Sequence, residues 1–355
     1  MKKTTKRVMS SFAAGLMALG LSACGGSASS PAASGGTASS SGGAAGAAFP
    51  TMSIQIAHVN PTTDEDQYNK FAVLFAEKVT EATDGAVTFE ICGNSELGSE
   101  GDVITGMGLG THQMSVMSNL AYAAVNGPSK VSEMPFMFAD SKQAAAFFDS
   151  DIEKEVTDAM YDSLGVKVLG WAEGGFRNIL SQKPIRTPED IKGMKIRVPE
   201  SDTFMKTFEA LGANPTPMAF SEVFTAVQQG TIDGLELPVA SAYTGSYYEV
   251  CAYYDLTGHF YNGLAMSIST KLWETLTPEL QEIFETCAVE AGQEQRTWLA
   301  GKEDEMKKAM AEAGCTIVDD VDVEALRQAA ASVYDFYRDE IGADLQDRAM
   351  AFING

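Results

Sequence analysis

The sequence predicts an α/β protein whose body is built from two lobes. Segments with strand periodicity and segments with helix periodicity alternate from about residue 50 onward, and this alternation favours a layered α/β architecture. About 305 residues follow that point, which is enough for two lobes of ordinary domain size. Near the C-terminus helical spacing continues over 277–313, and we expect one long helix there that spans both lobes.

Periodicity and glycine stops predict the elements of the first half. Alternating apolar residues predict strands over 52–59, 87–92, 114–117 and 166–171. Apolar residues at helical spacing predict helices over 68–83, 103–109 and 141–164. Gly85 and Gly165 mark the ends of the first and last of these helices.

Capping residues mark the helix starts of the second half. Thr187 precedes a proline at the first helical position and an acid at the third, a pattern typical of a helix start. Further helices are predicted over 203–211 and 221–229, and strands over 194–198 and 232–237. Thr277 and Pro278 begin the long C-terminal helix in the same way.

The N-terminus has the composition of an export signal. A basic stretch with Lys2, Lys3, Lys6 and Arg7 precedes an apolar stretch over 12–21 that is too short to span a bilayer. The next residues end in Leu-Ser-Ala-Cys and resemble a lipobox. We therefore expect a lipoprotein signal peptide over 1–23 and a lipid on Cys24. An ordinary signal peptide with a chance cysteine stays open.

Residues 24–49 are almost entirely glycine, serine and alanine, a composition that buries little apolar surface and predicts a flexible tether. The expected body, 50–355, would then be exported and held at a membrane surface, in a periplasm or on the outer face of a cell membrane. The formal net charge of -23 argues against nucleic-acid binding, which needs a basic footprint.

No sequence motif points to a metal, a cofactor or catalysis. Cys92, Cys251, Cys287 and Cys315 form no CxxC pair, so a metal site is not expected. One disulfide or four buried thiols both remain open. We find no nucleophile elbow, phosphate loop or zinc-protease motif. We therefore expect a protein that is not an enzyme and needs no cofactor, with an exported hydrolase as the alternative.

Two arginines stand apart from the other basic residues. Arg197 lies in a short apolar run that reads as a strand, and Arg177 follows Gly174, Gly175 and Phe176 just before another alternating segment. Burying an unpaired charge costs several kcal/mol, so a guanidinium at such a place needs an anionic partner. Two of them in so acidic a chain predict a pocket for a carboxylate.

An ordered set of short motifs over about 54–336 resembles the DctP family, the substrate-binding proteins of tripartite ATP-independent periplasmic (TRAP) transporters. No single motif is specific, but the order across most of the chain is. The motifs are 95–98 (SELG), 175–177 (GFR), 188–199 (PEDIKGMKIRVP), 211–218 (LGANPTPM), 220–224 (FSEVF) and 229–234 (QGTIDG).

The resemblance implies a two-lobed fold like that of periplasmic binding proteins, with an interlobe cleft and a long C-terminal helix spanning the lobes. The expected first lobe comprises about 50–172 and 260–275, the second about 173–259, and 277–355 would pack on both. The expected partners are a small organic acid anion and the membrane subunits of a TRAP permease. An ABC-type solute-binding lipoprotein is the alternative.

The resemblance also implies roles for individual residues. Arg197 matches the arginine that pairs with the substrate carboxylate, and a planar guanidinium suits that partner better than lysine does. Arg177 matches a supplementary arginine, and pairing with an internal acid is its alternative. Weaker candidates for the cleft, each with a capping, packing or solvated role as its alternative, are Asn60, Ser118, Asn119, Glu173 and Phe220.

One position departs from the family pattern. Where members commonly have Gln-Glu-Asn-Pro after Asp-Gly, this chain has Leu235, Glu236, Leu237 and Pro238. Leu237 therefore replaces an asparagine that bonds the ligand or orients the arginine, and it makes that wall of the pocket more apolar. This predicts a monocarboxylate with an apolar or less hydroxylated body.

Overall fold

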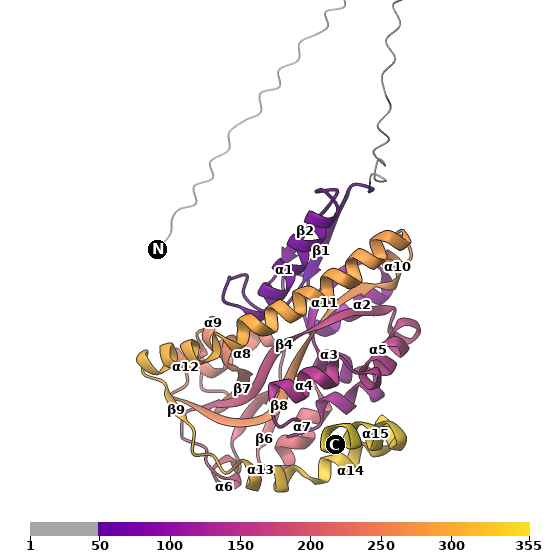
Figure 1. Ribbon diagram of the computed structural model, residues 1–355. Coiled ribbons are helices and arrows are strands. Elements are labelled where there is room, and N and C mark those ends of the chain that lie inside the picture. The colour runs from indigo at the N-terminus through magenta and orange to yellow at the C-terminus, as the bar shows by residue number, and fades with distance from the viewer. Residues whose placement is uncertain (1–48) are drawn as a thin grey trace, which may run out of the picture. The chain divides into compact units, whose positions relative to one another are not determined.

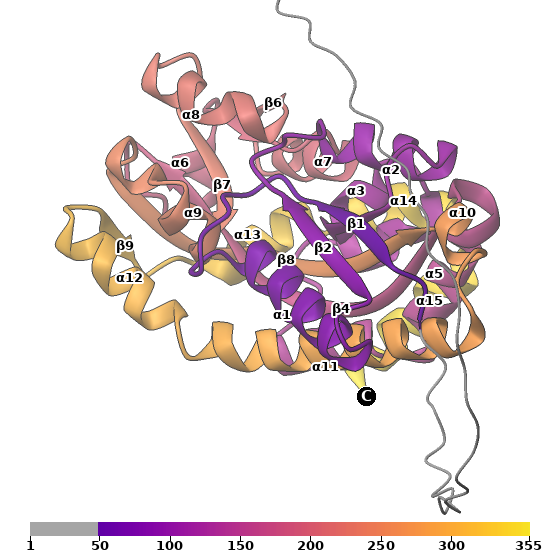
Figure 2. The ribbon, with the colours of Figure 1, turned by 90° about the horizontal axis from the view of Figure 1, so that it is seen from above.

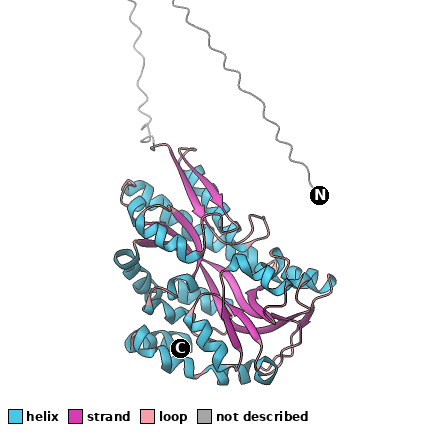
Figure 3. Cartoon of the chain, turned by 180° about the vertical axis from the view of Figure 1, so that it is seen from behind, coloured by secondary structure: helices cyan, strands magenta, loops and turns pink. Residues whose placement is uncertain are grey.

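The computed structural model describes residues 49–355 (Figure 1). The predicted signal peptide, Cys24 and the predicted tether up to residue 48 lie outside the described residues. Strands form the centre of the molecule and helices surround them, as the secondary-structure colours show (Figure 3). None of the helices in 49–355 has the length and apolar character needed to cross a membrane.

Nine strands within the described residues form one mixed sheet in the order β2-β1-β3-β8-β4-β7-β5-β6, with β9 paired to β8. Two long antiparallel strands, β4 and β8, pair with each other at the centre of the sheet; β8 also pairs with β3, and β4 also pairs with β7. The strands are β1 (Met52–Ala57), β2 (Val87–Cys92), β3 (Met114–Ser118), β4 (Val166–Ser181), β5 (Lys195–Val198), β6 (Asn214–Pro217), β7 (Gly234–Pro238), β8 (Tyr253–Ser269) and β9 (Thr316–Val318).

The strand register divides this sheet between two lobes. In the first lobe, the parallel strands β2, β1 and β3 meet the C-terminal part of β8. In the second lobe, the parallel strands β6, β5 and β7 meet the C-terminal part of β4. The two-lobed α/β architecture is therefore confirmed, while the residue boundaries given above for each lobe stay a prediction.

Helices cover both lobes. Those before the second lobe are α1 (Gln67–Ala82), α2 (Glu100–Leu109), α3 (Asn119–Ala123), the 3-10 helix η1 (Gly127–Glu133), α4 (Ser141–Phe148) and α5 (Asp151–Leu164). Those of the second lobe are α6 (Pro188–Ile191), α7 (Asp202–Ala210), α8 (Phe220–Gln228), α9 (Val239–Thr244) and the 3-10 helix η2 (Tyr247–Glu249). The remainder are α10 (Thr270–Trp273), α11 (Pro278–Ala300), α12 (Glu303–Glu312), α13 (Val323–Ala330), α14 (Ser332–Ile341) and α15 (Ala343–Asn354).

Two predicted helices are each divided in the structure. The helix expected over 141–164 breaks between α4 and α5, where the Ser150 side chain accepts from the backbone N–H of Glu153 and caps α5. The helix expected over 277–313 breaks at Gly301, which ends α11 before α12 begins. Strand β8 was not predicted from the sequence; it is buried along almost its whole length and alternates between large apolar and small residues only over 264–269.

Helix α11 packs along strand β4 (Figures 1 and 2). Its backbone approaches β4 closely because Gly292 has no side chain: a Cβ there would lie 2.2 Å from the carbonyl oxygen of Trp171. One helical turn further, the fully buried Gln295 donates to the carbonyl oxygen of Glu173 at 2.7 Å and accepts from its N–H at 3.0 Å. These contacts anchor α11 at the middle of β4.

The four cysteines of the described residues, Cys92, Cys251, Cys287 and Cys315, are buried and free. Burial raises the pKa of Cys251 to about 12 and that of Cys315 to about 11, which keeps both thiols protonated at neutral pH. The sequence left open one disulfide or four buried thiols, and the structure has four buried thiols.

Glu153 on α5 makes the stability of the first lobe sensitive to pH. Its side chain is buried, its Oε2 has no hydrogen-bond partner, and burial raises its pKa to about 8. The pKa of Glu153 is higher in the folded state than in the unfolded state, so the folded state is favoured while this side chain is protonated. This contribution to the free energy of unfolding is complete below about pH 4.5 and is lost as pH rises through about 8.

We expect Glu153→Gln to raise the free energy of unfolding at pH 9 by roughly 1–3 kcal/mol, because the amide leaves no charge to be buried. Thermal unfolding followed by circular dichroism at pH 5, 7 and 9 measures this. Asp162→Asn, an exposed acid on the same helix, is the matched control. A variant that is no more stable than the parent at pH 9 contradicts the prediction.

Candidate functional site

Two adjoining cavities lie between the lobes, at the C-terminal ends of β1 and β3 on one side and of β5 and β7 on the other. The inner cavity has a volume of about 40 Å³ and the outer one about 110 Å³. The C-terminal ends of parallel strands are the usual ligand site of open α/β sheets. The inner cavity is lined by Val59, Asn60, Tyr68, Glu100, Ser118, Leu120, Arg177, Arg197, Pro199, Phe220, Leu237 and Ser241.

Arg197, on β5, lines both cavities and is 3% exposed. Its Nε and Nη2 both donate to the carbonyl oxygen of Met218, at 3.0 and 2.6 Å, and within residues 49–355 it forms no ion pair. Burial lowers the pKa of Arg197 to about 10; attraction to Glu236 opposes this effect and repulsion from Arg177 adds to it. A buried guanidinium without a carboxylate partner creates a site that favours an anion.

Arg177, on β4, also lines the inner cavity but already has an internal partner. Its Nε donates to Oε2 of Glu236, and its Nη2 donates to Oε1 at 2.7 Å. Glu236 lies on the neighbouring strand β7 and is fully buried. Although burial opposes the charge of Arg177, attraction to Glu236 raises its pKa. The Arg177 charge is therefore balanced within the protein.

His259, on β8, completes this buried group. Its Nε2 lies 3.5 Å from Oε2 of Glu236, and its Nδ1 lies 2.8 Å from the hydroxyl of Thr257. Burial lowers the pKa of His259, and the hydrogen bond and charge of Glu236 oppose that effect. The ring of Phe204 lies 5.3 Å from the Arg177 guanidinium and helps to hold it in place.

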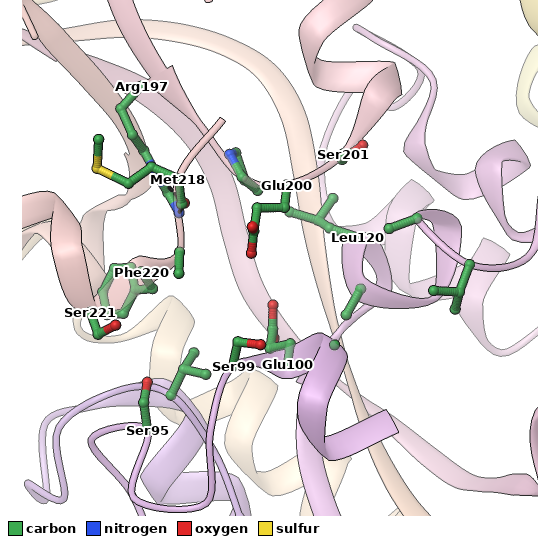
Figure 4. Close-up of a pocket in the computed structure, with 17 residues that line it drawn as sticks. Ser95, Ser99, Glu100, Leu120, Arg197, Glu200, Ser201, Met218, Phe220 and Ser221 are labelled. Carbon is green, nitrogen blue, oxygen red and sulfur yellow. Dashed lines mark hydrogen bonds between the residues drawn. The ribbon is translucent and has the colours of Figure 1, made fainter. Parts of the chain in front are cut away.

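Glu100 is a cavity residue that the sequence did not reveal. It lies in the first turn of α2, and Figure 4 shows it beside Ser99 on the side of the outer cavity that faces Arg197 and Phe220. Its Oε1 accepts from the N–H of Ser118 at 3.0 Å, and burial raises its pKa, although Arg177 and Arg197 act against that. An acid in the first turn of a helix is common for dipole reasons, so its position carried no distinctive signal.

Asn60 and Ser118 bring polar groups to the inner cavity. The Asn60 Nδ2 donates to Asp66 at 2.8 Å and to Ser241 at 3.0 Å, so its Oδ1 is the part left to receive a donor. The Ser118 hydroxyl donates to the side-chain oxygen of Asn262 and accepts from the N–H of Leu120. Both side chains are held in place by the protein around them.

Apolar side chains form the rest of the wall. Leu237, on β7, is 3% exposed, and Leu120, in the first turn of α3, is equally buried. Phe220 begins α8 and packs towards Tyr247, with ring centroids 6.0 Å apart. The predicted residues Arg197, Arg177, Asn60, Ser118, Phe220 and Leu237 thus come together in one cavity.

Asn119 and Glu173, also predicted for the site, do not line either cavity. The Asn119 Nδ2 donates to the carbonyl oxygen of Ser132 and its Oδ1 accepts from the N–H of Gly263, so it ties η1 to β8. The Glu173 carboxylate accepts from the hydroxyl of Ser141 on α4. Both side chains are used within the fold.

Comparison with known proteins agrees with this arrangement. The family model for bacterial extracellular solute-binding protein family 7, DctP, matches residues 56–340. A relative from Escherichia coli (strain K12), the 2,3-diketo-L-gulonate-binding periplasmic protein YiaO, is 31% identical over 306 residues, which are 84% of this chain and 93% of the relative.

Solved structures of TRAP periplasmic solute-binding proteins have the same fold. The one from Polaromonas sp. JS666, bound to D-erythronate, superposes with a TM-score of 0.81 at 29% identity and covers 84% of this chain and 98% of that chain. The one from Pseudomonas putida F1, with bound D-glucuronate, gives 0.80 at 31% identity, with 84% and 97% covered. The chain therefore belongs to the DctP family and is a solute-binding protein of the TRAP type.

Proposed function

We propose that this protein binds the carboxylate of a small organic acid at Arg197, in the cavity between the lobes. The observation that carries the proposal is the buried Arg197 guanidinium, which lacks a carboxylate partner within residues 49–355. An anion there would compensate the unfavourable burial of the charge, and bidentate pairing would orient it. Arg177 supplements this contact from the cavity wall while Glu236 balances its charge.

The charges around the cavity favour one carboxylate on the ligand over two. Among the residues 49–355 that line the cavity, Arg197 offers the one positive charge that Glu236 does not already balance at close range, and Glu100 places a carboxyl group near it. A second carboxylate on the ligand would lie near Glu100, and the repulsion between the two negative charges would weaken binding. Glu100 and the Oδ1 of Asn60 instead suit hydroxyl donors.

The apolar residues of the wall suit the carbon skeleton of the ligand. Leu120, Phe220 and Leu237 lie in the same cavity as Arg197 and offer it no hydrogen bond from their side chains. The ligand is therefore a monocarboxylate with hydroxyls directed to Glu100 and a less polar face against Leu237. This keeps the single carboxylate and the apolar wall that the sequence predicts, but it allows more hydroxyls than the sequence predicts, because Glu100 adds an acceptor. Relatives bind D-erythronate and D-glucuronate, which have one carboxylate and several hydroxyls.

We also propose that the protein delivers its solute to a membrane permease. The protein is a receptor without catalytic activity, and it passes the bound acid to the membrane subunits of a TRAP permease. A lipid on Cys24 and the stretch up to residue 49 would hold it near that permease, because the Leu-Ser-Ala-Cys segment resembles a lipobox and the following residues have a tether composition. Mass spectrometry of the protein from membranes tests the lipid.

We expect Arg197→Ala to weaken the binding of D-glucuronate or D-erythronate roughly 100-fold or more, because a charge-assisted bidentate contact is lost. Arg197→Lys recovers only part of this loss. Isothermal titration calorimetry measures both, with Arg186→Ala as a control, since Arg186 is a partly exposed arginine outside the cavity. Near-normal affinity of Arg197→Ala would remove this residue from the site.

A panel of acids tests the charge argument. We expect hydroxylated monocarboxylates to bind at least 10-fold more tightly than succinate or malate, because Glu100 repels a second carboxylate. Glu100→Gln should reduce this preference, since the amide removes the negative charge and keeps its size. Tighter binding of a dicarboxylate than of every monocarboxylate tested, to the unmodified protein, refutes the assignment.

Removing the acid that balances Arg177 should destabilise the fold. We expect Glu236→Gln to lower the free energy of unfolding by about 3–5 kcal/mol, because Arg177 would be left as a buried unpaired charge. Chemical denaturation at pH 7 measures the change, and Glu222→Gln on the exposed face of α8 is the control. An unchanged unfolding midpoint would show that the ion pair does not stabilise the fold.

A further inference from the structure

A second group of polar side chains joins the two lobes behind the inner cavity. The segment between β1 and α1 contributes Asn60 and Asp66, α1 contributes Gln67, and α9 contributes Ser241 and Thr244. We call these five residues the interlobe cluster. The first three belong to the lobe of β1, and the last two follow β7 of the other lobe.

Three hydrogen bonds of the interlobe cluster cross from one lobe to the other. The Ser241 hydroxyl accepts from Asn60 Nδ2 at 3.0 Å and from Gln67 Nε2 at 2.6 Å. The Thr244 hydroxyl lies 3.0 Å from Oδ2 of Asp66, which also accepts from Asn60. Asn60, Asp66, Gln67 and Ser241 are between 0% and 3% exposed, so their mutual contacts are shielded from water. Thr244 is half-buried, and its partner Asp66 is fully buried.

Asp66 is rigidly placed for this contact. Its Oδ1 accepts from the N–H groups of Tyr68 and Asn69 at 2.9 and 3.1 Å and thereby caps α1. That leaves Oδ2 for Asn60 on its own side and for Thr244 of the other lobe. The carboxylate therefore links the start of α1 to α9.

The hydrogen bond from Thr244 of α9 to Asp66 can be replaced by one within α9 if the lobes separate. The Thr244 hydroxyl has one proton and two acceptors in reach, Oδ2 of Asp66 at 3.0 Å and the carbonyl oxygen of Ala240 at 2.9 Å. After separation it can donate to Ala240 within its own helix, so no donor is left unpaired. The same hydroxyl can thus serve an open and a closed arrangement.

The interlobe cluster is also continuous with the ligand cavity. Asn60 and Ser241 line the inner cavity together with Arg197, and α9 begins directly after the strand that carries Leu237. The movement that encloses an anion at Arg197 therefore brings Ser241 and Thr244 onto Asn60 and Asp66. Asn60 belongs to both the interlobe cluster and the ligand cavity, because its Nδ2 donates to Asp66 and Ser241 while its Oδ1 remains for the solute.

We propose that the interlobe cluster is a latch that holds the lobes closed over the bound acid and slows its release, with Asp66 and Thr244 as positioning residues. The inference rests on the proposed function, because it assigns the closure of that same cavity. Loss of one hydrogen bond to the buried carboxylate should increase the dissociation rate of D-glucuronate roughly 3- to 10-fold. The association rate should change little, since the contact forms after the acid has entered.

Thr244→Val tests the latch with little other disturbance. The residue does not line either cavity and does not cap α1, and valine keeps its shape while removing the hydroxyl. Stopped-flow fluorescence with D-glucuronate measures both rates, and Thr244→Ser should restore the slow release because it returns the donor. The control is Thr297→Val on α11, which loses the same hydrogen bond to the carbonyl four residues earlier but has no partner in the other lobe.

A double-variant comparison tests whether Asp66 is the partner. Asp66→Asn keeps an oxygen for the cap of α1 and removes one acceptor. If Asp66 and Thr244 act through their mutual bond, the pair of substitutions should increase dissociation no more than Asp66→Asn does alone. Additive effects, or an unchanged dissociation rate in Thr244→Val, would overturn the proposal.

A second readout separates this proposal from the proposed function. Spin labels on Glu96→Cys and Glu222→Cys, exposed positions next to the outer-cavity residues Ser95 and Ser221, report the distance between the segment after β2 and α8 without any ligand. Thr244→Val should shift that distance distribution to longer values, and an unchanged distribution refutes the latch. If the unmodified protein binds none of the acids tested, the proposed function fails, and the label distances still decide whether the latch exists.

Discussion

The balance of charge between the buried side chains of Arg177, Glu236 and Arg197 is the constraint on which the site depends. Arg177 and Glu236 neutralise each other on adjacent strands, and His259 borders them from β8. Arg197 sits next to this pair with hydrogen bonds from Nε and Nη2 to a carbonyl oxygen, and that contact does not balance its charge. If Glu236 could reach Arg197 as closely as it reaches Arg177, the cavity would lack its attraction for an anion.

The long strands place this charge arrangement between the lobes. β4 carries Arg177 at the point where its pairing passes from one half of the sheet to the other, and β8 carries His259 near the same point. Gln295 of α11 holds β4 from one side through two backbone hydrogen bonds. The cavity with Arg177 and Arg197 is thus attached to the part of the fold that both lobes share.

Six of the residues that the sequence predicts for the site line the inner cavity, and their roles in binding stay a prediction. Arg197, Asn60, Phe220, Ser118 and Leu237 lie at or next to strand ends or a helix start, and the parallel topology gathers such positions at one edge. Arg177 reaches the cavity from the interior of β4. Sequence reasoning did not identify Glu100, because an acid in a first helical turn is ordinary. It also placed Asn119 and Glu173 in the cleft by nearness in sequence, whereas Asn119 begins α3 and bonds Ser132 and Gly263, and Glu173 accepts from Ser141.

The sequence by itself determined the alternation of strands and helices, the acidic composition, the apolar Leu237 and the arginines that need an anionic partner. These follow from local periodicity and from the cost of burying charge. Only the tertiary structure decided which arginine has its charge balanced internally, that Glu100 faces Arg197, and that Asp66 meets Thr244 across the lobes. Those outcomes depend on contacts between residues distant in the chain, which strand order and register create.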